Sequence, residues 1–220
     1  MTTRTTLRRD LADLKQKVYT LGERILEISD IYNSLLESYT TSLEKRLIDI
    51  TNETKAESKG LHEQCFLVLT LQQPLIKDLR FVIGSLQIVL NLEKICEQYY
   101  STLPQVSSIP TLDIKLKSDF VKMGRGAGEM LRNSLTLYLS SNISAIQEVK
   151  KSFAEVNYLH DLLYKQILNE VASASGQKAQ VEAQLLSTVR SIEKIADSIL
   201  NIVDQVNYII IGQQTAEKDS

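Results

Sequence analysis

Apolar residues recur every three or four positions along nearly the whole chain, which is the period of an amphipathic α-helix. The first such stripe predicts one long helix and comprises Leu7, Leu11, Leu14, Val18, Leu21, Ile25, Ile28, Ile31 and Leu35. Thr41 and Glu44 fit a capping box that would begin a second helix ending near Leu71. Pro74 is expected in the first turn of a third helix, where a missing N–H is tolerated. That helix carries Leu79, Val82, Ile83, Leu86, Val89, Leu90 and Ile95.

The segment TLPQVSSIPTLD, residues 102–113, contains two prolines and a serine pair and predicts a linker. The helical period then returns in one helix through Phe120 and Leu137, another from about Ser144 to Val171, and a last helix to about Gly212. A small-residue loop, ASASGQ, separates the last two. We therefore predict an all-α fold of two tandem three-helix bundles with six long helices, formed by residues 1–107 and 108–220.

Two pairs of landmarks indicate that the second half repeats the first. The strings LEKI at 92–95 and IEKI at 192–195 lie 100 residues apart, and Gly22 and Gly124 lie 102 apart. Similar offsets in the same order favour an internal duplication. Gly124 begins the string GRGAG, whose small residues would let helices pack closely.

Composition narrows the function classes. The chain has 43% hydrophobic and 24% charged residues and a net charge of −2, with acidic and basic residues interspersed, so nucleic acid is not expected as a partner. No signal peptide and no apolar run of about 20 residues is apparent, and a cytoplasmic protein is expected. Cys65 and Cys96 stand alone in apolar contexts and are interpreted as small buried hydrophobes. The sequence has no phosphate-binding loop or nucleophile elbow, so we do not expect an enzyme.

Carboxylates form a line on the third and the last predicted helix. Helical geometry places Glu93 near Glu97, and it groups Glu193, Asp197, Asn201 and Asp204 on one face. Such a stripe is either a solvated helix face or a surface that binds hard cations. The only histidines, His62 and His160, lie outside any E-x-x-H pair, which argues against a ferritin-like di-iron site. Asn157 and His160 form an i,i+3 pair that either faces the last helix or lies at the surface or core edge, and we favour the second interpretation.

The stretch LTLQQPLIKDLRFVIGSLQIVLNLEKICE, residues 69–97, resembles the signature of the PhoU family, in which QQP-x3-DLR precedes an acidic motif. RSIEKIADSILNIVDQVNYIIIGQ resembles the matching segment of the family's second repeat, including the close at Gly212-Gln213. Gly22 and Gly124 fit the glycines of the family's helix starts. The resemblance covers essentially the whole chain, and it implies two tandem three-helix bundles.

The resemblance also implies metal ligands, because some members bind multinuclear clusters through E/D-x-x-x-D motifs. Carried over by position, the ligands would be Glu193, Asp197, Asn201, Asn157 and Asp161 in the second repeat and Glu93 and Glu97 in the first. The helix-two positions fall at Thr51, Lys55 and Ser58, and Lys55 would neutralise Glu93 or Glu97 by pairing. The helix-five partners fall at Phe153, Asn157 and His160 or Asp161. A divalent, iron or zinc ion is expected at the second stripe only.

The resemblance implies a non-catalytic regulator of phosphate uptake and starvation signalling. Its partners would be the ATPase subunit of the phosphate ABC transporter and a sensor histidine kinase, with membrane association only through them. We expect a homodimer that contacts partners through Gln73, Pro74, Asp78 and Arg80. Three alternatives stay open: a PhoU-like accessory protein of another transporter or channel, a metal-storage or di-metal oxidase bundle, and a self-associating structural protein.

Overall fold

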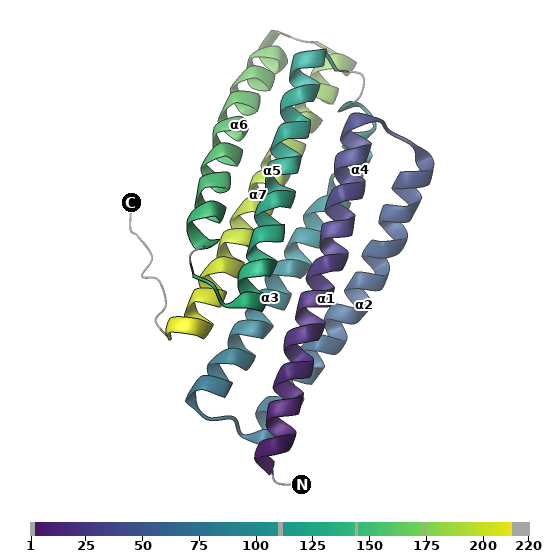
Figure 1. Ribbon diagram of the computed structural model, residues 1–220. Helices are drawn as coiled ribbons and strands as arrows, with labels where there is room; N and C mark the ends of the chain where they lie inside the picture. Colours follow the sequence, from purple (N-terminus) through teal and green to yellow (C-terminus); the bar gives the residue numbers. More distant parts are fainter. Residues whose placement is uncertain (1–2, 110–111, 144, 174, 213–220) are drawn as a thin grey trace.

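The structure, a computed structural model, describes residues 3–109, 112–143, 145–173 and 175–212. These residues form helices and no strand (Figure 1). The elements are α1 (Thr3–Glu37), α2 (Thr41–Gln72), α3 (Ile76–Ser101), α4 (Leu103–Val106), α5 (Ile114–Ser140), α6 (Ala145–Ser173) and α7 (Gln177–Ile211). The six long helices expected from the apolar period are confirmed, and the four-residue α4 is added to them. No described helix combines the length and apolar character needed to cross a bilayer.

The helices form two three-helix units that pack side by side. Helices α1, α2 and α3 contact one another, and so do α5, α6 and α7. The two units meet where α1 contacts α5 and where α3 contacts α7. Four helices therefore form the middle of the molecule, while α2 and α6 lie on its two outer sides (Figure 1).

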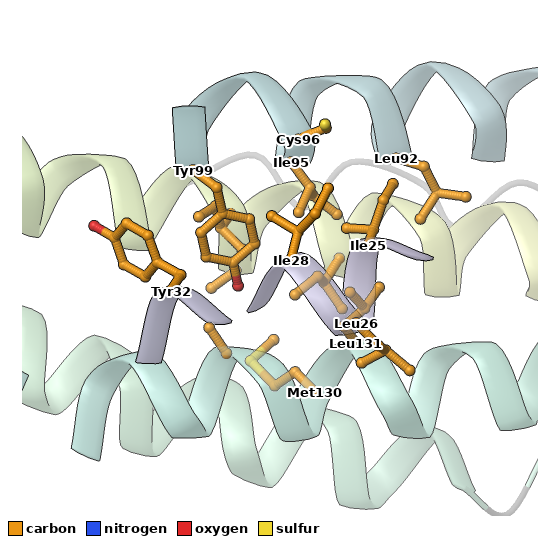
Figure 2. Packing of buried hydrophobic residues seen from close by; sticks show 14 of the residues in the cluster. Ile25, Leu26, Ile28, Tyr32, Leu92, Ile95, Cys96, Tyr99, Met130 and Leu131 are labelled. Carbon is orange, nitrogen blue, oxygen red and sulfur yellow. The ribbon is translucent and has the colours of Figure 1, made fainter. Parts of the chain in front are cut away.

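One continuous core runs through both units. Figure 2 shows Ile25 and Ile28 of α1 close to Ile95 of α3, with Met130 and Leu131 of α5 on the other side. Buried hydroxyls at this junction are paired, as buried polar groups must be. Tyr32 Oη lies 2.9 Å from Thr102 Oγ1, and Tyr99 Oη donates a hydrogen bond of 2.9 Å to Ser29 Oγ.

Two glycines bring α1 and α5 into close contact. A Cβ atom on Gly22 would lie 2.3 Å from Leu135 Cδ2, and one on Gly124 would lie 2.3 Å from Asn33 Oδ1. The offset of 102 residues between the glycines also separates Asn33 from Leu135. Each unit thus offers its glycine to the equivalent side chain of the other, as in an interface between two identical subunits. The glycines lie within α1 and α5, so their interpretation as helix starts is wrong, whereas the close packing expected at GRGAG is confirmed.

Two helix boundaries differ from the expectation. The N-cap of α2 is Thr40, whose hydroxyl accepts a 3.3 Å hydrogen bond from the Leu43 amide. Glu44 accepts a 2.5 Å hydrogen bond from the Tyr39 hydroxyl, so the predicted Thr41–Glu44 capping box is wrong. Pro74 precedes α3 and lies outside its first turn. It follows Gln73, which caps α2 in the left-handed conformation (φ 43°) and ends that helix.

The predicted linker is a packed segment over most of its length. Thr102, Leu103, Val106 and Ile109 are buried, and α4 contacts α7. Residues 110 and 111 of this segment lie outside the described residues, as do Ala174 of the small-residue loop and the chain after Gly212. The division at residue 107 stays a prediction.

Candidate functional site

In the first unit, Glu93 on α3 is held by two side chains of α2. Ser58 Oγ donates a hydrogen bond to Glu93 Oε1, and His62 Nε2 lies 3.5 Å from Glu93 Oε2. The cavity beside them, which Cys96 also lines, has a volume of about 10 Å³. This is about the space of one water molecule. The cavity leaves no room for a cluster with the side chains as they stand, and metal binding by Glu93 and Glu97 stays a prediction.

The second unit repeats this arrangement between α6 and α7. His160 Nε2 lies 3.2 Å from Glu193 Oε2, and His160 Nδ1 lies 3.2 Å from Asp161 Oδ1. The imidazole stacks on Tyr164 at 5.7 Å between ring centroids, and the Tyr164 hydroxyl accepts a 2.8 Å hydrogen bond from Arg190. His160 and Asp161 were alternatives for one helix-five partner. His160 contacts Glu193, while Asp161 is exposed.

The interpretation of Lys55 as an ion-pair partner is wrong. Its Nζ lies over the Tyr100 ring, 5.2 Å from the centroid, and no ion pair joins it to Glu93 or Glu97 in the described part of the chain. Tyr100 follows Glu97 by three positions on the same helix face, so a cation–π contact replaces the expected salt bridge. Glu97 itself is exposed.

The second stripe has a mixed set of possible metal donors. Partial burial raises the pKa of Asp197, and nearby His160 acts in the opposite direction. Asn201 is exposed, whereas Asn157 is partly buried. Asn157 Oδ1 is buried without a hydrogen-bond partner among the described residues, whereas His160 Nε2 has its contact with Glu193 Oε2. An imidazole nitrogen beside oxygens suits zinc or iron. Over the described ranges, no three His, Cys, Asp or Glu side chains are placed to share one ion. Metal binding stays a prediction.

The QQP–DLR stretch joins α2 to α3 and packs against the end of α7. Pro74 is buried and Gln73 is exposed. Arg80 lies against Gly212, where an added Cβ would be 2.0 Å from its Nη1 atom. A cation at this place interacts favourably with the negative, C-terminal end of the α7 dipole. Asp78 lies in the first turn of α3, at the positive end of that helix.

Both cysteines are buried in the core, as expected. Cys65 and Cys96 are both buried and free. Burial raises the pKa of each thiol to about 11. Because the thiolate is the reactive form, neither residue is a candidate nucleophile or redox centre.

Comparison with known families bears on this architecture. The PhoU domain matches the chain twice, at residues 18–101 and 120–206. The chain belongs to the PhoU family. The two matched stretches correspond to the two three-helix units, so the predicted internal repeat and the resemblance are both confirmed.

Curated relatives extend over nearly the full chain. A phosphate-specific transport system accessory protein PhoU homolog from Clostridium acetobutylicum is 24% identical over 99% of this chain and 100% of its own length. A homolog of the same name from Synechocystis is 26% identical over 93% of this chain and 91% of its own length.

Solved PhoU structures share the fold. PhoU from Pseudomonas aeruginosa superposes with a TM-score of 0.85 at 16% identity, covering 94% of this chain and 99% of that one. The phosphate transport system regulatory protein PhoU from Streptococcus pneumoniae gives 0.81 at 20% identity, covering 95% and 99%. The predicted pair of tandem three-helix bundles is thereby confirmed.

Sequence reasoning missed that both histidines of this PhoU chain face the stripe glutamates. His62 and His160 lie on the outer helices α2 and α6, each opposite the glutamate of an EKI string. The available signal was their offset of 98 residues, close to the offsets of 100 and 102 shown by the other repeat landmarks.

Proposed function

We propose that this PhoU protein is a non-catalytic regulator that couples the phosphate ABC transporter to a sensor histidine kinase on the cytoplasmic side of the membrane. The observation that carries the proposal is the double PhoU match along a chain whose full-length relatives are named accessory proteins of the phosphate-specific transport system. The helical scaffold supports an adaptor role because it offers long outer faces on α2 and α6.

The α2–α3 turn supplies the proposed contact surface. Gln73 is exposed and Asp78 is half-buried, so both present polar groups to a partner. Pro74 and Arg80 would support this surface without contacting the partner, because the proline is buried and Arg80 packs on the end of α7. A partner bound at this turn would therefore contact both units.

Genetic complementation tests this function. In a host lacking its own copy, the wild-type chain is expected to restore repression of a phosphate-starvation reporter at high phosphate. Gln73→Ala/Asp78→Lys is expected to restore it poorly. Glu63→Lys, which alters another exposed position on α2, serves as the matched control. If deletion leaves both phosphate uptake and the reporter unchanged, the proposal fails.

We also propose that the second stripe binds one transition-metal ion, because His160 Nε2 lies 3.2 Å from the Glu193 carboxylate and Asn157, one turn earlier on α6, has a buried Oδ1 without a hydrogen-bond partner. Elemental mass spectrometry would compare protein purified without chelator with Glu193→Ala/Asp197→Ala and with Glu93→Ala/Glu97→Ala. Metal lost only in the first variant is the expected result. Equal metal content in all three proteins would show that neither stripe binds the ion.

A second candidate is an accessory role for another transporter or channel. It is favoured by the α2 positions where the resemblance implies carboxylates, because they carry Thr51, Lys55 and Ser58 instead. Affinity purification from the native host would distinguish the two roles, since recovery of a different transporter without the phosphate transporter favours this one. Light scattering of the same preparation tests the expected homodimer.

A further inference from the structure

One end of the bundle gathers most of the large apolar side chains that are exposed among the described residues. This end holds the start of α1, the α2–α3 turn, the α5–α6 turn and the end of α7 (Figure 1). Contacts between these segments confirm the grouping. Gln72 Nε2 donates to Asp10 Oδ2 at 3.2 Å, Lys15 Nζ donates to the Leu139 carbonyl at 2.9 Å, and Arg80 abuts Gly212. We call it the apolar end.

The most exposed of these side chains lie at the α2–α3 turn. Leu71, Leu75 and Ile76 are 72%, 75% and 74% exposed. Fourteen large apolar residues are exposed in the described part of the chain, and ten of them belong to this end. Besides the three at the turn, these are Phe66, Leu67, Leu79, Ile83, Leu139, Ile143 and Ile211. Large exposed apolar surfaces mark binding sites more often than not.

The fold does not require an apolar turn at this place. The equivalent connection of the second repeat, between α6 and α7, has the sequence ASASGQ and lies at the opposite end of the bundle (Figure 1). The same supersecondary unit therefore closes with small and polar residues. Large apolar side chains at Leu71, Leu75 and Ile76 are therefore not needed to close this turn.

The charges around the apolar end favour an anionic surface. Its exposed cations are Arg8, Arg9, Lys77, Lys150 and Lys151, and its carboxylates are Asp10, Asp13, Asp78 and Glu148, of which Asp13 is paired with Lys17. Asp10 already lies 3.8 Å from Arg9 and accepts from Gln72, and Asp78 is half-buried. The outward charge at this end is thus positive although the whole chain carries −2.

We propose that the apolar end binds directly to the surface of an anionic lipid bilayer. Leu71, Leu75 and Ile76 enter the boundary between headgroups and acyl chains, and the surrounding cations contact lipid phosphates. The aliphatic groups lie on a projecting turn, whereas surface pockets of about 730 and 460 Å³ lie elsewhere, between α1 and α2 and at the start of α5. A projecting turn suits insertion into lipid better than seating a peptide.

This binding goes beyond the proposed function and does not depend on it. It also departs from the expectation that membrane association occurs only through protein partners. Direct contact would hold the bundle end-on to the membrane, with the α1–α2 and α6–α7 turns at the far end (Figure 1).

Vesicle flotation with the purified full-length chain tests the proposal. Vesicles of phosphatidylcholine alone and with phosphatidylglycerol would be compared for the wild type, Leu75→Asp/Ile76→Asp and Lys77→Gln. The matched control is Ile114→Asp, since Ile114 is 90% exposed at the opposite end. All four positions are exposed, and circular dichroism checks that each variant is folded.

We expect the wild type to bind only vesicles with phosphatidylglycerol, and less tightly as salt is raised. Leu75→Asp/Ile76→Asp should weaken binding by more than roughly ten-fold, and Lys77→Gln by about five-fold, while Ile114→Asp binds like the wild type. A wild type that ignores the vesicles, or an equal loss in Ile114→Asp, overturns the proposal. If vesicle binding is absent but Leu75→Asp/Ile76→Asp fails in the reporter assay, the apolar end binds a protein instead.

Discussion

The reciprocal glycine contacts between α1 and α5 allow a quantitative test of how the two units are joined. Leu135 is buried and fills the space above Gly22. Leu135→Ala removes this contact and should lower the free energy of unfolding by about 2–5 kcal/mol. Gly22→Ala alone should have a small net effect: a gain in helix propensity of about 1 kcal/mol opposes overpacking of about 1–3 kcal/mol.

The double variant should behave differently from the sum of the two. With Leu135 shortened, the methyl group at position 22 no longer meets Leu135 Cδ2 at 2.3 Å, so its helix propensity is gained without overpacking. It also fills part of the space that Leu135 leaves. We expect Gly22→Ala/Leu135→Ala to be about 1–2 kcal/mol more stable than Leu135→Ala, with a favourable coupling of about 2 kcal/mol.

Urea unfolding followed by circular dichroism would measure the cycle. The control pairs Leu135→Ala with Gly60→Ala, because Gly60 lies within α2 and a Cβ there meets nothing within 4 Å. That pair should be additive within about 0.5 kcal/mol. If the Gly22 cycle is equally additive, the close approach of α1 and α5 does not depend on Gly22, and the reasoning is refuted.

Other perturbations address the helix ends, the thiols and the buried hydroxyls. Gly212→Ala should destabilise the protein by about 1–2 kcal/mol, because φ is 82° there and the methyl group would meet Arg80. Gly60→Ala should stabilise it by about 1 kcal/mol, because a Cβ there meets nothing within 4 Å. Thermal unfolding should therefore show a lower melting temperature for the first variant and a higher one for the second. Cys65 and Cys96 should resist a thiol reagent at pH 8 until urea unfolds the chain, and fast labelling of the native protein would contradict their burial. Burial raises the pKa of Tyr99 from 10.0 to about 12, so this group stabilises the fold fully below pH 10 and loses that contribution of about 2–3 kcal/mol as the pH rises to 12. Tyr99→Phe should be about 1 kcal/mol less stable than the wild type at pH 7, from the lost bond to Ser29. This difference should shrink above pH 10 and change sign before pH 12, and a constant difference across that window would contradict the assignment.

The helices were predictable because their signal is repeated over many turns. The apolar stripe from Leu7 to Leu35 has one interpretation at the period of 3.6 residues, and α1 follows it. Boundaries rest on single contacts and were less secure. Thr40 and Thr41 are equally good caps by type, and only the geometry of the chain selects Thr40.

The sequence predicted which positions of the candidate site face one another, but not which contacts their side chains make. Counting back from QQP placed Ser58 among the helix-two positions of the expected site, and in the structure Ser58 donates a hydrogen bond to Glu93. The same counting could not show that Lys55 turns to the Tyr100 ring. The exposure of Leu79 and Ile83 was also invisible, because an apolar stripe on a helix looks the same whether it faces a core or the outside.

The two-fold relation between the units has a consequence for how this chain changes over time. Two copies of one self-associating three-helix protein, fused end to end, would give this arrangement, with Gly22 and Gly124 descended from one ancestral glycine. In such a dimer of separate chains every substitution appears twice, so neither half can change alone. Fusion removes that constraint. One half is then free to acquire an apolar turn at Leu71, Leu75 and Ile76 while the other keeps ASASGQ.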